Sequence, residues 1–319
     1  MNINELKDIA KRLVAPRKGI LAADESSKTI QKRFDKIGLQ SNPETNLIYR
    51  KMLFTAPGIE EFISGVILYD ETIRQSIDGL PVPKYLAKRG ILPGIKVDQG
   101  IVDEVTTGLD GLNERLTEYR NLGAKFAKWR AVIVVGQEDA LIEKNAENLA
   151  KYASLCQEQD IVPIVEPEVL MDGDHDLEKC KEVTSKTLKM VFAKLAASRV
   201  VLEGVILKPN MVISGKELVA QASAEEIAQA TIEVFKTVVP EQVPGIVFLS
   251  GGQTPDEATE NLAAINKIGG PWQLSFSYGR ALQDEALKTW IGKEENIEAA
   301  QKAFFERSRK VSLARQGKL

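Results

Sequence analysis

The stretch "GVILKPNMV" (residues 204–212) places a lysine directly after an apolar run and directly before a proline. Val205 to Leu207 are typical of the end of a buried strand. Pro209 has no backbone N–H for a sheet hydrogen bond, and it holds Lys208 outside the helical region of backbone space. The simplest interpretation is that Lys208 lays its apolar stem along the core and keeps its ammonium group in water. The sequences of the other predicted strands favour a different interpretation of Lys208.

Seven other apolar runs also end in polar or glycine residues: "GILAADES" (19–26), "ISGVILYDE" (63–71), "LPGIKVD" (92–98), "KFAKWR" (125–130), "VPIVEPE" (162–168), "IVFLSGG" (246–252) and "QLSFSYGR" (273–280). Helical patterns separate most of them, which predicts a parallel sheet with helices outside it. Eight such units in 319 residues predict a closed α/β barrel, the (β/α)8 or TIM barrel, as a single domain over residues 1–319. An open doubly wound sheet is the alternative, but no G-x-G-x-x-G follows the first strand.

Two of the predicted helices begin with capping boxes. Ser223 and Glu226 have the required spacing after the sixth strand, as do Thr254 and Glu257 after the seventh. A third helix, after the third strand, is predicted to stop at Gly123. Apolar residues at helical spacing predict a further helix over residues 3–13. That helix and the C-terminal stretch from about residue 281 are expected as extras around the barrel.

Composition excludes several classes of protein. Hydrophobic residues make up 44% and charged residues 27% of the chain, and the net charge is −3, so we expect no nucleic-acid or membrane partner. No apolar run approaches the roughly 20 residues that span a bilayer. The N-terminus lacks a signal-peptide pattern, and Cys156 and Cys180 do not indicate a disulfide framework. A cytoplasmic location is therefore expected.

The single histidine, His175, argues against a metal cofactor. A catalytic zinc usually has three protein ligands, mostly His or Cys, and one histidine with two scattered cysteines cannot easily supply them. We therefore expect no metal and no other cofactor, and chemistry that runs on Lys, Glu, Asp, Arg, Tyr or Ser.

Ionisable residues stand at nearly every predicted strand end, where a barrel of this kind has its active site. They include three lysines, Lys96, Lys128 and Lys208. Facing lysines repel each other, which lowers a lysine pKa from about 10.4 toward neutrality, as a Schiff-base lysine needs. We therefore predict Lys208 as the nucleophile and Lys128 as the charge that tunes it.

Carboxylates at neighbouring strand ends fit the same chemistry. Forming an imine requires a proton for the carbinolamine oxygen, and Glu166 is within plausible reach across the barrel mouth. Pro167 separates it from Glu168 and stiffens the strand end. Asp24 could take a proton from a substrate hydroxyl, although capping of the following helix is an alternative role for it.

The last two strands predict an anion site. Ser250 and Gly251 precede a helix start, and Gly279 and Arg280 follow the eighth strand, where barrels frequently bind phosphate. A second set of polar and cationic residues is expected near strands one, three and four: Lys96, Arg130, Ser26, Thr29 and Arg33. Two anion sites beside a lysine nucleophile indicate a substrate with a phosphate at each end and a ketone between them.

Seven of these motifs together resemble the class I fructose-bisphosphate aldolases: "KGILAADES", "GIKVD", "AKWRAV", "VPIVEPE", "LKPNMV", "FLSGGQ" and "SFSYGRALQ". The resemblance runs from Lys18 to about Gln283. It implies a (β/α)8 barrel that cleaves fructose 1,6-bisphosphate reversibly into dihydroxyacetone phosphate and glyceraldehyde 3-phosphate, without metal. It also implies small sugar phosphates as the binding partners and a homo-oligomer no larger than a tetramer.

Carried over motif by motif, the resemblance assigns most of the site. Its catalytic set is Lys208 as the imine lysine, Lys128 as its partner, Glu166 as the main acid/base, Glu168 as its neighbour and Asp24 near the bond that breaks. Its phosphate contacts are Lys96, Arg130, Ser250, Gly251, Gly279 and Arg280, with Ser26, Thr29 and Arg33 at the far phosphate.

The chain departs from the family pattern in two places, and other functions compete with this one. Lys28 stands where better-known members have glycine, and no tyrosine follows Tyr278, whereas animal members end in one. A transaldolase or deoxyribose-phosphate aldolase type would need only one strong phosphate site. A role in protein binding alone would tolerate loss of Lys208, which is present.

Treatment with EDTA should leave aldol cleavage unchanged, because one histidine and two separated cysteines cannot build a zinc site. The measurement is the steady-state cleavage rate after exhaustive dialysis against the chelator, with a known zinc enzyme treated in parallel. Activity that is lost and then restored by zinc would contradict the composition argument.

Overall fold

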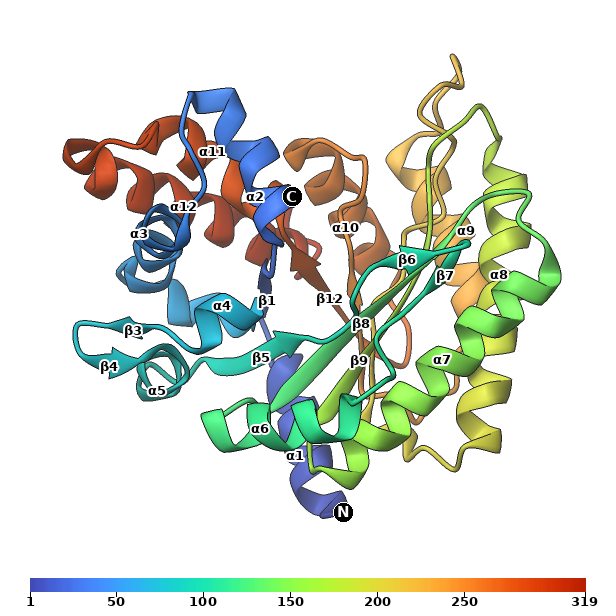
Figure 1. The fold of residues 1–319 in the computed structure, drawn as a ribbon. Coiled ribbons are helices and arrows are strands. Elements are labelled where there is room, and N and C mark those ends of the chain that lie inside the picture. The colour runs from blue at the N-terminus through green and yellow to red at the C-terminus, as the bar shows by residue number, and fades with distance from the viewer.

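The computed structural model describes residues 1–319 and contains eight parallel strands closed into one barrel (Figure 1). The barrel strands are β1 (Gly19–Ala23), β2 (Ile63–Leu68), β5 (Leu92–Lys96), β8 (Phe126–Ile133), β9 (Val162–Val169), β10 (Ile206–Leu207), β11 (Gly245–Phe248) and β12 (Gln273–Tyr278). Each pairs in parallel with its neighbours in chain order, and β1 closes the ring by pairing with β12. The predicted (β/α)8 barrel is confirmed, and the open doubly wound sheet is excluded.

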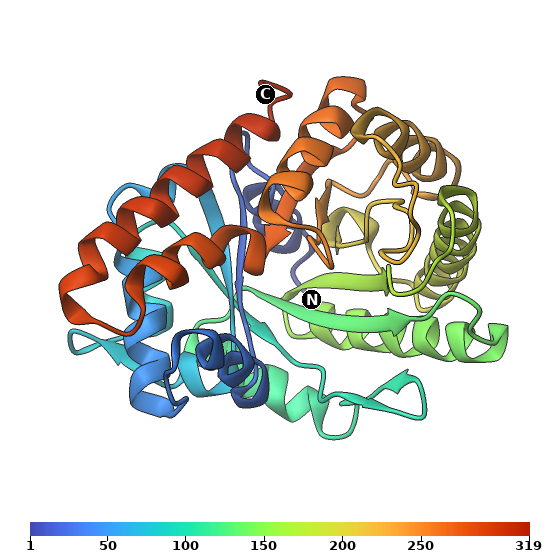
Figure 2. The same cartoon turned by 90° about the horizontal axis from the view of Figure 1, so that it is seen from above.

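Twelve α-helices accompany the barrel, most of them around its outside when it is seen from above (Figure 2). They are α1 (Ile3–Leu13), α2 (Ser27–Phe34), α3 (Pro43–Thr55), α4 (Asp70–Ile73), α5 (Val82–Lys88), α6 (Leu112–Leu122), α7 (Asp139–Glu158), α8 (Leu177–Ala197), α9 (Ala224–Val238), α10 (Pro255–Ile268), α11 (Arg280–Trp290) and α12 (Ile297–Ala314). Two hairpins lie outside the barrel sheet: β3 (Ser76–Ile77) with β4 (Leu80–Pro81), and β6 (Ile101–Val102) with β7 (Val105–Thr106). No helix combines the length and apolar character that crossing a bilayer requires.

Local sequence signals set the helix ends as predicted. Both capping boxes form: Ser223 caps α9 and Thr254 caps α10, each accepting a hydrogen bond from the backbone N–H three residues later. Helix α6 ends at Gly123, whose φ of 114° lies in the left-handed region that glycine adopts without a Cβ penalty.

The opening helix α1 closes the lower end of the barrel instead of lying around its outside (Figure 1). Its buried face forms one apolar cluster with inward-facing residues of the barrel strands. Val14, directly after α1, packs against Gly245 of β11, where a Cβ would lie only 2.6 Å from Val14 Cγ1. Because α1 plugs this end, solvent and substrate reach the barrel interior from the opposite end, where the strands finish.

The C-terminal stretch divides into two parts. Helix α11 follows β12 directly and is the helix of the last barrel unit, so only α12 is an extra element; it packs against α3, α10 and α11. Directly after α12, the buried Arg315 donates hydrogen bonds to the carbonyl oxygens of Val14, Ala15 and Lys18, with 2.6 Å from Nη2 to the Val14 oxygen. This contact fixes the chain between α1 and β1.

Arg315→Met should lower the free energy of unfolding by about 2–3 kcal/mol, because three carbonyl groups lose a charged donor. The turnover number should stay unchanged, since Arg315 lies at the closed end of the barrel. Urea unfolding measures the first quantity, and Arg309→Met, which removes an exposed arginine of α12, is the matched control. Equal stability of the two variants would contradict the role of Arg315.

Candidate active site

A cavity of about 990 Å³ opens at the carboxyl ends of the barrel strands. All residues that the sequence predicts for catalysis or phosphate binding line it: Asp24, Ser26, Thr29, Arg33, Lys96, Lys128, Arg130, Glu166, Glu168, Lys208, Ser250, Gly251, Gly279 and Arg280. Barrel closure therefore brings together side chains from both ends of the sequence. No residue after Arg280 lines the cavity.

Lys208 is buried at this end of the barrel. Strand β10 ends at Leu207, and the Lys208 backbone N–H still donates to Val165 O of β9 (2.8 Å), before Pro209 ends the pairing. Only 4% of the residue is exposed, so the interpretation that its ammonium group lies in bulk water is wrong. Its Nζ lies 3.0 Å from Glu166 Oε1.

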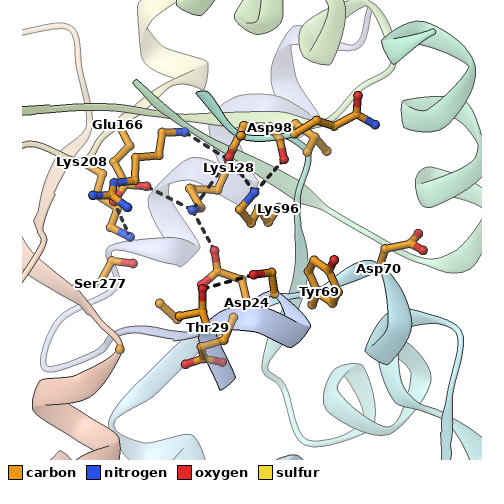
Figure 3. A pocket seen from close by; sticks show the side chains of 18 of the residues that line it. Asp24, Thr29, Tyr69, Asp70, Lys96, Asp98, Lys128, Glu166, Lys208 and Ser277 are labelled. Atoms are coloured by element: carbon orange, nitrogen blue, oxygen red, sulfur yellow. Dashed lines mark hydrogen bonds and ion pairs between the residues drawn. The ribbon is translucent and has the colours of Figure 1, made fainter. Parts of the chain in front are cut away.

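Lys128 of β8 lies among three carboxylates (Figure 3). Its Nζ is 2.8 Å from Asp24 Oδ2, 3.3 Å from Glu166 Oε2 and 3.9 Å from Asp98 Oδ2. Burial alone would lower the pKa of Lys128, but the attraction of these carboxylates outweighs burial and raises its pKa above the usual value. Lys128 is therefore a permanent positive charge at neutral pH.

The two carboxylates that Lys128 contacts most closely stay ionised. Burial tends to raise the pKa of Asp24, but Lys128 and Lys208 together lower it far below its usual value. The pKa of Glu166 is also lowered, because the same two lysines outweigh its burial. Asp24 does not cap the next helix, since the N-cap residue of α2 is Ser26. The two lysines thus do not simply face each other as predicted, because Glu166 bridges them.

Asp98 is a member of the site that the sequence analysis did not single out. It lies just beyond β5 and accepts a 2.6 Å contact from Lys96 Nζ, while its other carboxylate oxygen faces Lys128. The backbone N–H of Arg130 also donates to it (3.3 Å). The position of Asp98 at the end of the run "LPGIKVD" was the available signal, since Asp24, Glu166 and Glu168 had been selected at such places.

Glu168, two residues after Glu166 on β9, forms a close ion pair with Arg130. Burial raises the pKa of Glu168 above its usual value even though Arg130 opposes the shift. A side chain at Gly251 would displace Glu168, because a Cβ would lie 2.5 Å from Glu168 Oε1. Glu166 and Glu168 thus have opposite pKa shifts, as expected for one group that stays charged and one that binds a proton more readily.

Arg33 lies elsewhere in the cavity than the sequence analysis expected. It was grouped with Ser26 and Thr29, whose hydroxyl oxygens are 3.1 Å apart at the start of α2. Its guanidinium instead reaches Gly279, where a Cβ would be 3.3 Å from Arg33 Nη2. Arg33 lies in the second turn of α2, which faces the end of β12. It therefore belongs with Gly279 and Arg280, in the other predicted anion site.

The cavity is positively charged in a chain that is negative overall. Its lining holds nine basic and seven acidic side chains, a net charge of +2, whereas the whole chain has −3. Six of the nine basic groups are paired with carboxylates. Lys28, Arg115 and Arg280 have no carboxylate within 4.0 Å, and of these Arg115 donates to the backbone oxygens of Val97 and Gly108. Unpaired cations in a concave site favour an anionic ligand. No group of three or more His, Cys, Asp or Glu side chains is arranged to hold a metal ion.

Comparison with known proteins identifies the family. The family model described as fructose-bisphosphate aldolase class-I matches residues 5–319. A probable fructose-bisphosphate aldolase class 1 from Xanthomonas campestris is 52% identical, covering 100% of this chain and 99% of the relative. Fructose-bisphosphate aldolase C from Carassius auratus is 48% identical over 98% of this chain and 90% of its own.

A solved structure agrees with the sequence comparisons. The fructose-bisphosphate aldolase of Plasmodium falciparum, solved with TRAP and a small-molecule inhibitor, superposes with a TM-score of 0.97 at 47% identity, covering 99% of this chain and 95% of that one. The parallel barrel with lysines and carboxylates at its mouth, together with these relatives, defines an enzyme of the lyase class. The chain belongs to the class I fructose-bisphosphate aldolase family. The family and function predicted from the sequence motifs are confirmed.

The ion pairs of Lys128 should make stability depend on pH in the acid range. Asp24 and Glu166 have lowered pKa values in the folded protein, so their contribution is fully present above the usual carboxyl pKa of about 4 and is lost as pH falls below it. Lys128→Met removes the largest of the attractions that lower the two pKa values, while Lys208 still contributes. The difference in melting temperature between wild type and Lys128→Met should therefore be largest near pH 7 and shrink toward pH 3.

Calorimetric or fluorescence melts at a series of pH values measure this difference. Lys310→Met is the control, since Lys310 forms its ion pair with Asp256 on the surface, where pairs contribute little. A difference for Lys128→Met that stays constant from pH 7 to pH 3 would contradict the assigned shifts.

Proposed function

We propose that the reaction runs through an imine between Lys208 and the ketone of fructose 1,6-bisphosphate. Glu166 then acts as the main acid/base, Lys128 as the fixed positive charge and Asp24 as the base at the bond that breaks. The observation that carries this assignment is the chain of contacts from Lys208 through Glu166 and Lys128 to Asp24, with separations of 3.0, 3.3 and 2.8 Å. Every group in it is buried or nearly so.

Imine formation follows from the pair formed by Lys208 and Glu166. The lysine must lose a proton before its nitrogen can attack the ketone carbon, and the ionised Glu166 carboxylate lies 3.0 Å away to receive it. Attack gives a carbinolamine, and Glu166 returns the proton to its oxygen, which leaves as water. Lys128 keeps its charge throughout, because its pKa is raised, and it holds Glu166 in place.

Carbon–carbon cleavage follows from the position of Asp24. As a base it takes the proton of the C4 hydroxyl, the C3–C4 electron pair moves into the iminium, and the aldehyde product leaves. An enamine remains on Lys208, and protonation at carbon followed by hydrolysis releases dihydroxyacetone phosphate. Glu168, whose pKa is raised, is suited to exchange protons in these later steps.

The phosphate groups are assigned to the two ends of the cavity. Ser250, Gly251, Gly279 and Arg280 receive the ketose-side phosphate; Arg280 and the backbone of Gly279 stand at the N-terminus of α11, where N–H groups favour an anion. Lys96, Arg130, Ser26 and Thr29 receive the far phosphate. The proximity of Arg33 to Gly279 supports moving that residue from the far phosphate to the ketose side.

Three broader expectations stay proposals. Residues 1–319 are proposed to act as one domain, which the packing of α12 on α3 and α10 supports. A homo-oligomer no larger than a tetramer is proposed from the family resemblance, and a cytoplasmic location is proposed from the composition of the chain. Light scattering after gel filtration tests the oligomeric state, and fractionation of cells tests the location.

Reduction with borohydride in the presence of dihydroxyacetone phosphate should trap the ligand on Lys208, and peptide mapping identifies the modified residue. Lys208→Arg should have no measurable cleavage, since guanidinium stays protonated and cannot attack a ketone. Lys318→Arg, an exposed lysine outside the cavity, is the control. Trapping on Lys128 or Lys96, or cleavage by Lys208→Arg, would contradict the assignment.

A further inference from the structure

We propose that Gln283 is a positioning residue, which holds the Arg33 guanidinium at the ketose-side phosphate. The inference rests on the assignment of that phosphate to Gly279 and Arg280 under the proposed function. Gln283 lies in the first turn of α11, three residues after Arg280, and its exposed fraction is 0%. It does not line the cavity, so it acts through another residue.

The Gln283 amide is fully hydrogen-bonded. Its Oε1 accepts from Arg33 Nη1 (3.0 Å) and from the Tyr49 hydroxyl (2.9 Å). Its Nε2 donates to the backbone oxygen of Ala22 (2.6 Å) and to Glu25 Oε1 (3.2 Å). An amide has two donors and one oxygen with two lone pairs, and all are used. The amide cannot be turned over, because Arg33 can only donate and the Ala22 carbonyl can only accept.

The network uses Nη1 of Arg33 and leaves Nη2 without a protein partner. Arg33 Nη1 is shared between Gln283 Oε1 and Glu25 Oε1, which lies 2.5 Å away. Arg33 Nη2 has no protein hydrogen-bond acceptor and points toward Gly279, where a Cβ would lie 3.3 Å from it. Burial would lower the pKa of Arg33, but Glu25 and the other negative groups around it together raise it, so the guanidinium is charged. A charged, unused N–H group is therefore aimed at the glycine of the predicted phosphate loop.

Gln283 is needed because Glu25 alone does not determine where Arg33 points. Glu25 belongs to the connection between β1 and α2, whereas Gly279 belongs to the connection between β12 and α11. The Gln283 amide contacts Glu25 of the first connection and Ala22 of β1, and its backbone N–H donates to the Gly279 oxygen of the second connection (3.1 Å). It thus fixes Arg33 relative to Arg280 before substrate arrives, and preorganisation of this kind increases affinity.

The test compares Gln283→Met with Gln157→Met. Gln157 is also a buried glutamine that bonds backbone groups, both the N–H and the oxygen of Val201, but it lies outside the cavity. Gln283→Met should raise the Michaelis constants of fructose 1,6-bisphosphate and of fructose 1-phosphate by the same factor, about 5- to 50-fold, because both substrates have the ketose-side phosphate. Turnover at saturation should change less than threefold, and Gln157→Met should change neither constant.

Three results would overturn the proposal. The first is an unchanged Michaelis constant for both substrates in Gln283→Met, and the second is an increase for the bisphosphate alone, which would place the effect at the far phosphate. The third comes from Arg33→Met and the double variant. If Gln283 acts through Arg33, the double variant should be no worse than Arg33→Met, whereas multiplied effects would mean independent roles. Thermal melts of all variants check that each is folded.

Arg280→Ala separates this inference from the function on which it rests. If Arg280→Ala raises both Michaelis constants while Gln283→Met raises neither, the positioning role fails and the phosphate assignment stands. If Arg280→Ala changes neither constant, the phosphate assignment itself is wrong, whatever Gln283→Met does.

Discussion

The site depends on the ion pairs that form around Lys128. Two lysines cannot be buried beside each other unless carboxylates offset the cost of removing their charges from water. Glu166 lies between Lys128 and Lys208, and Asp24 and Asp98 complete the surroundings of Lys128. Each of these carboxylates comes from a different strand end, so the arrangement exists only in the closed barrel. The cluster of charged groups around Lys128 therefore depends on closure of the barrel.

Hydrogen bonds between the strands fix the relative positions of Glu166, Glu168 and Lys208. Strand β9 continues through Glu166 and Glu168 to Val169, which fixes both side chains on the same face of a paired strand. Strand β10 is only two residues long and ends at Leu207. The backbone N–H of Lys208 still donates a hydrogen bond to β9, which places the Lys208 side chain beside Glu166. A longer β10 would continue the sheet past Pro209, which has no N–H to donate. Pro209 thus ends the strand at Lys208, which explains why the lysine follows an apolar run and precedes a proline.

Sequence alone predicted the strands, their order and the residues at their ends, because apolar runs and strand-end polar residues can be read from short stretches of the chain. It did not predict how those residues pair. Asp98 was missed, and Arg33 was grouped with Ser26 and Thr29 although its guanidinium lies beside Gly279, because both positions depend on distances between elements far apart in the chain. Gln283 was quoted within a motif but given no role, since a neutral amide has no signal of its own. Helix α1 was recognised as a helix, but its place inside the barrel end depends on the shape of the cavity it fills.

The charges of the cavity divide into two groups with different tasks. Groups that are paired, such as Lys128 with its carboxylates or Arg130 with Glu168, contribute little net charge, and in the proposed mechanism they hold and move protons over short distances. Arg280, which has no carboxylate partner, and Arg33, whose Nη2 has no acceptor, leave N–H groups for a ligand. A phosphate bound there would meet donors that need not first break an internal ion pair. Separating paired from unpaired cations in this way lets one cavity keep ionised catalytic carboxylates and still attract a doubly phosphorylated substrate.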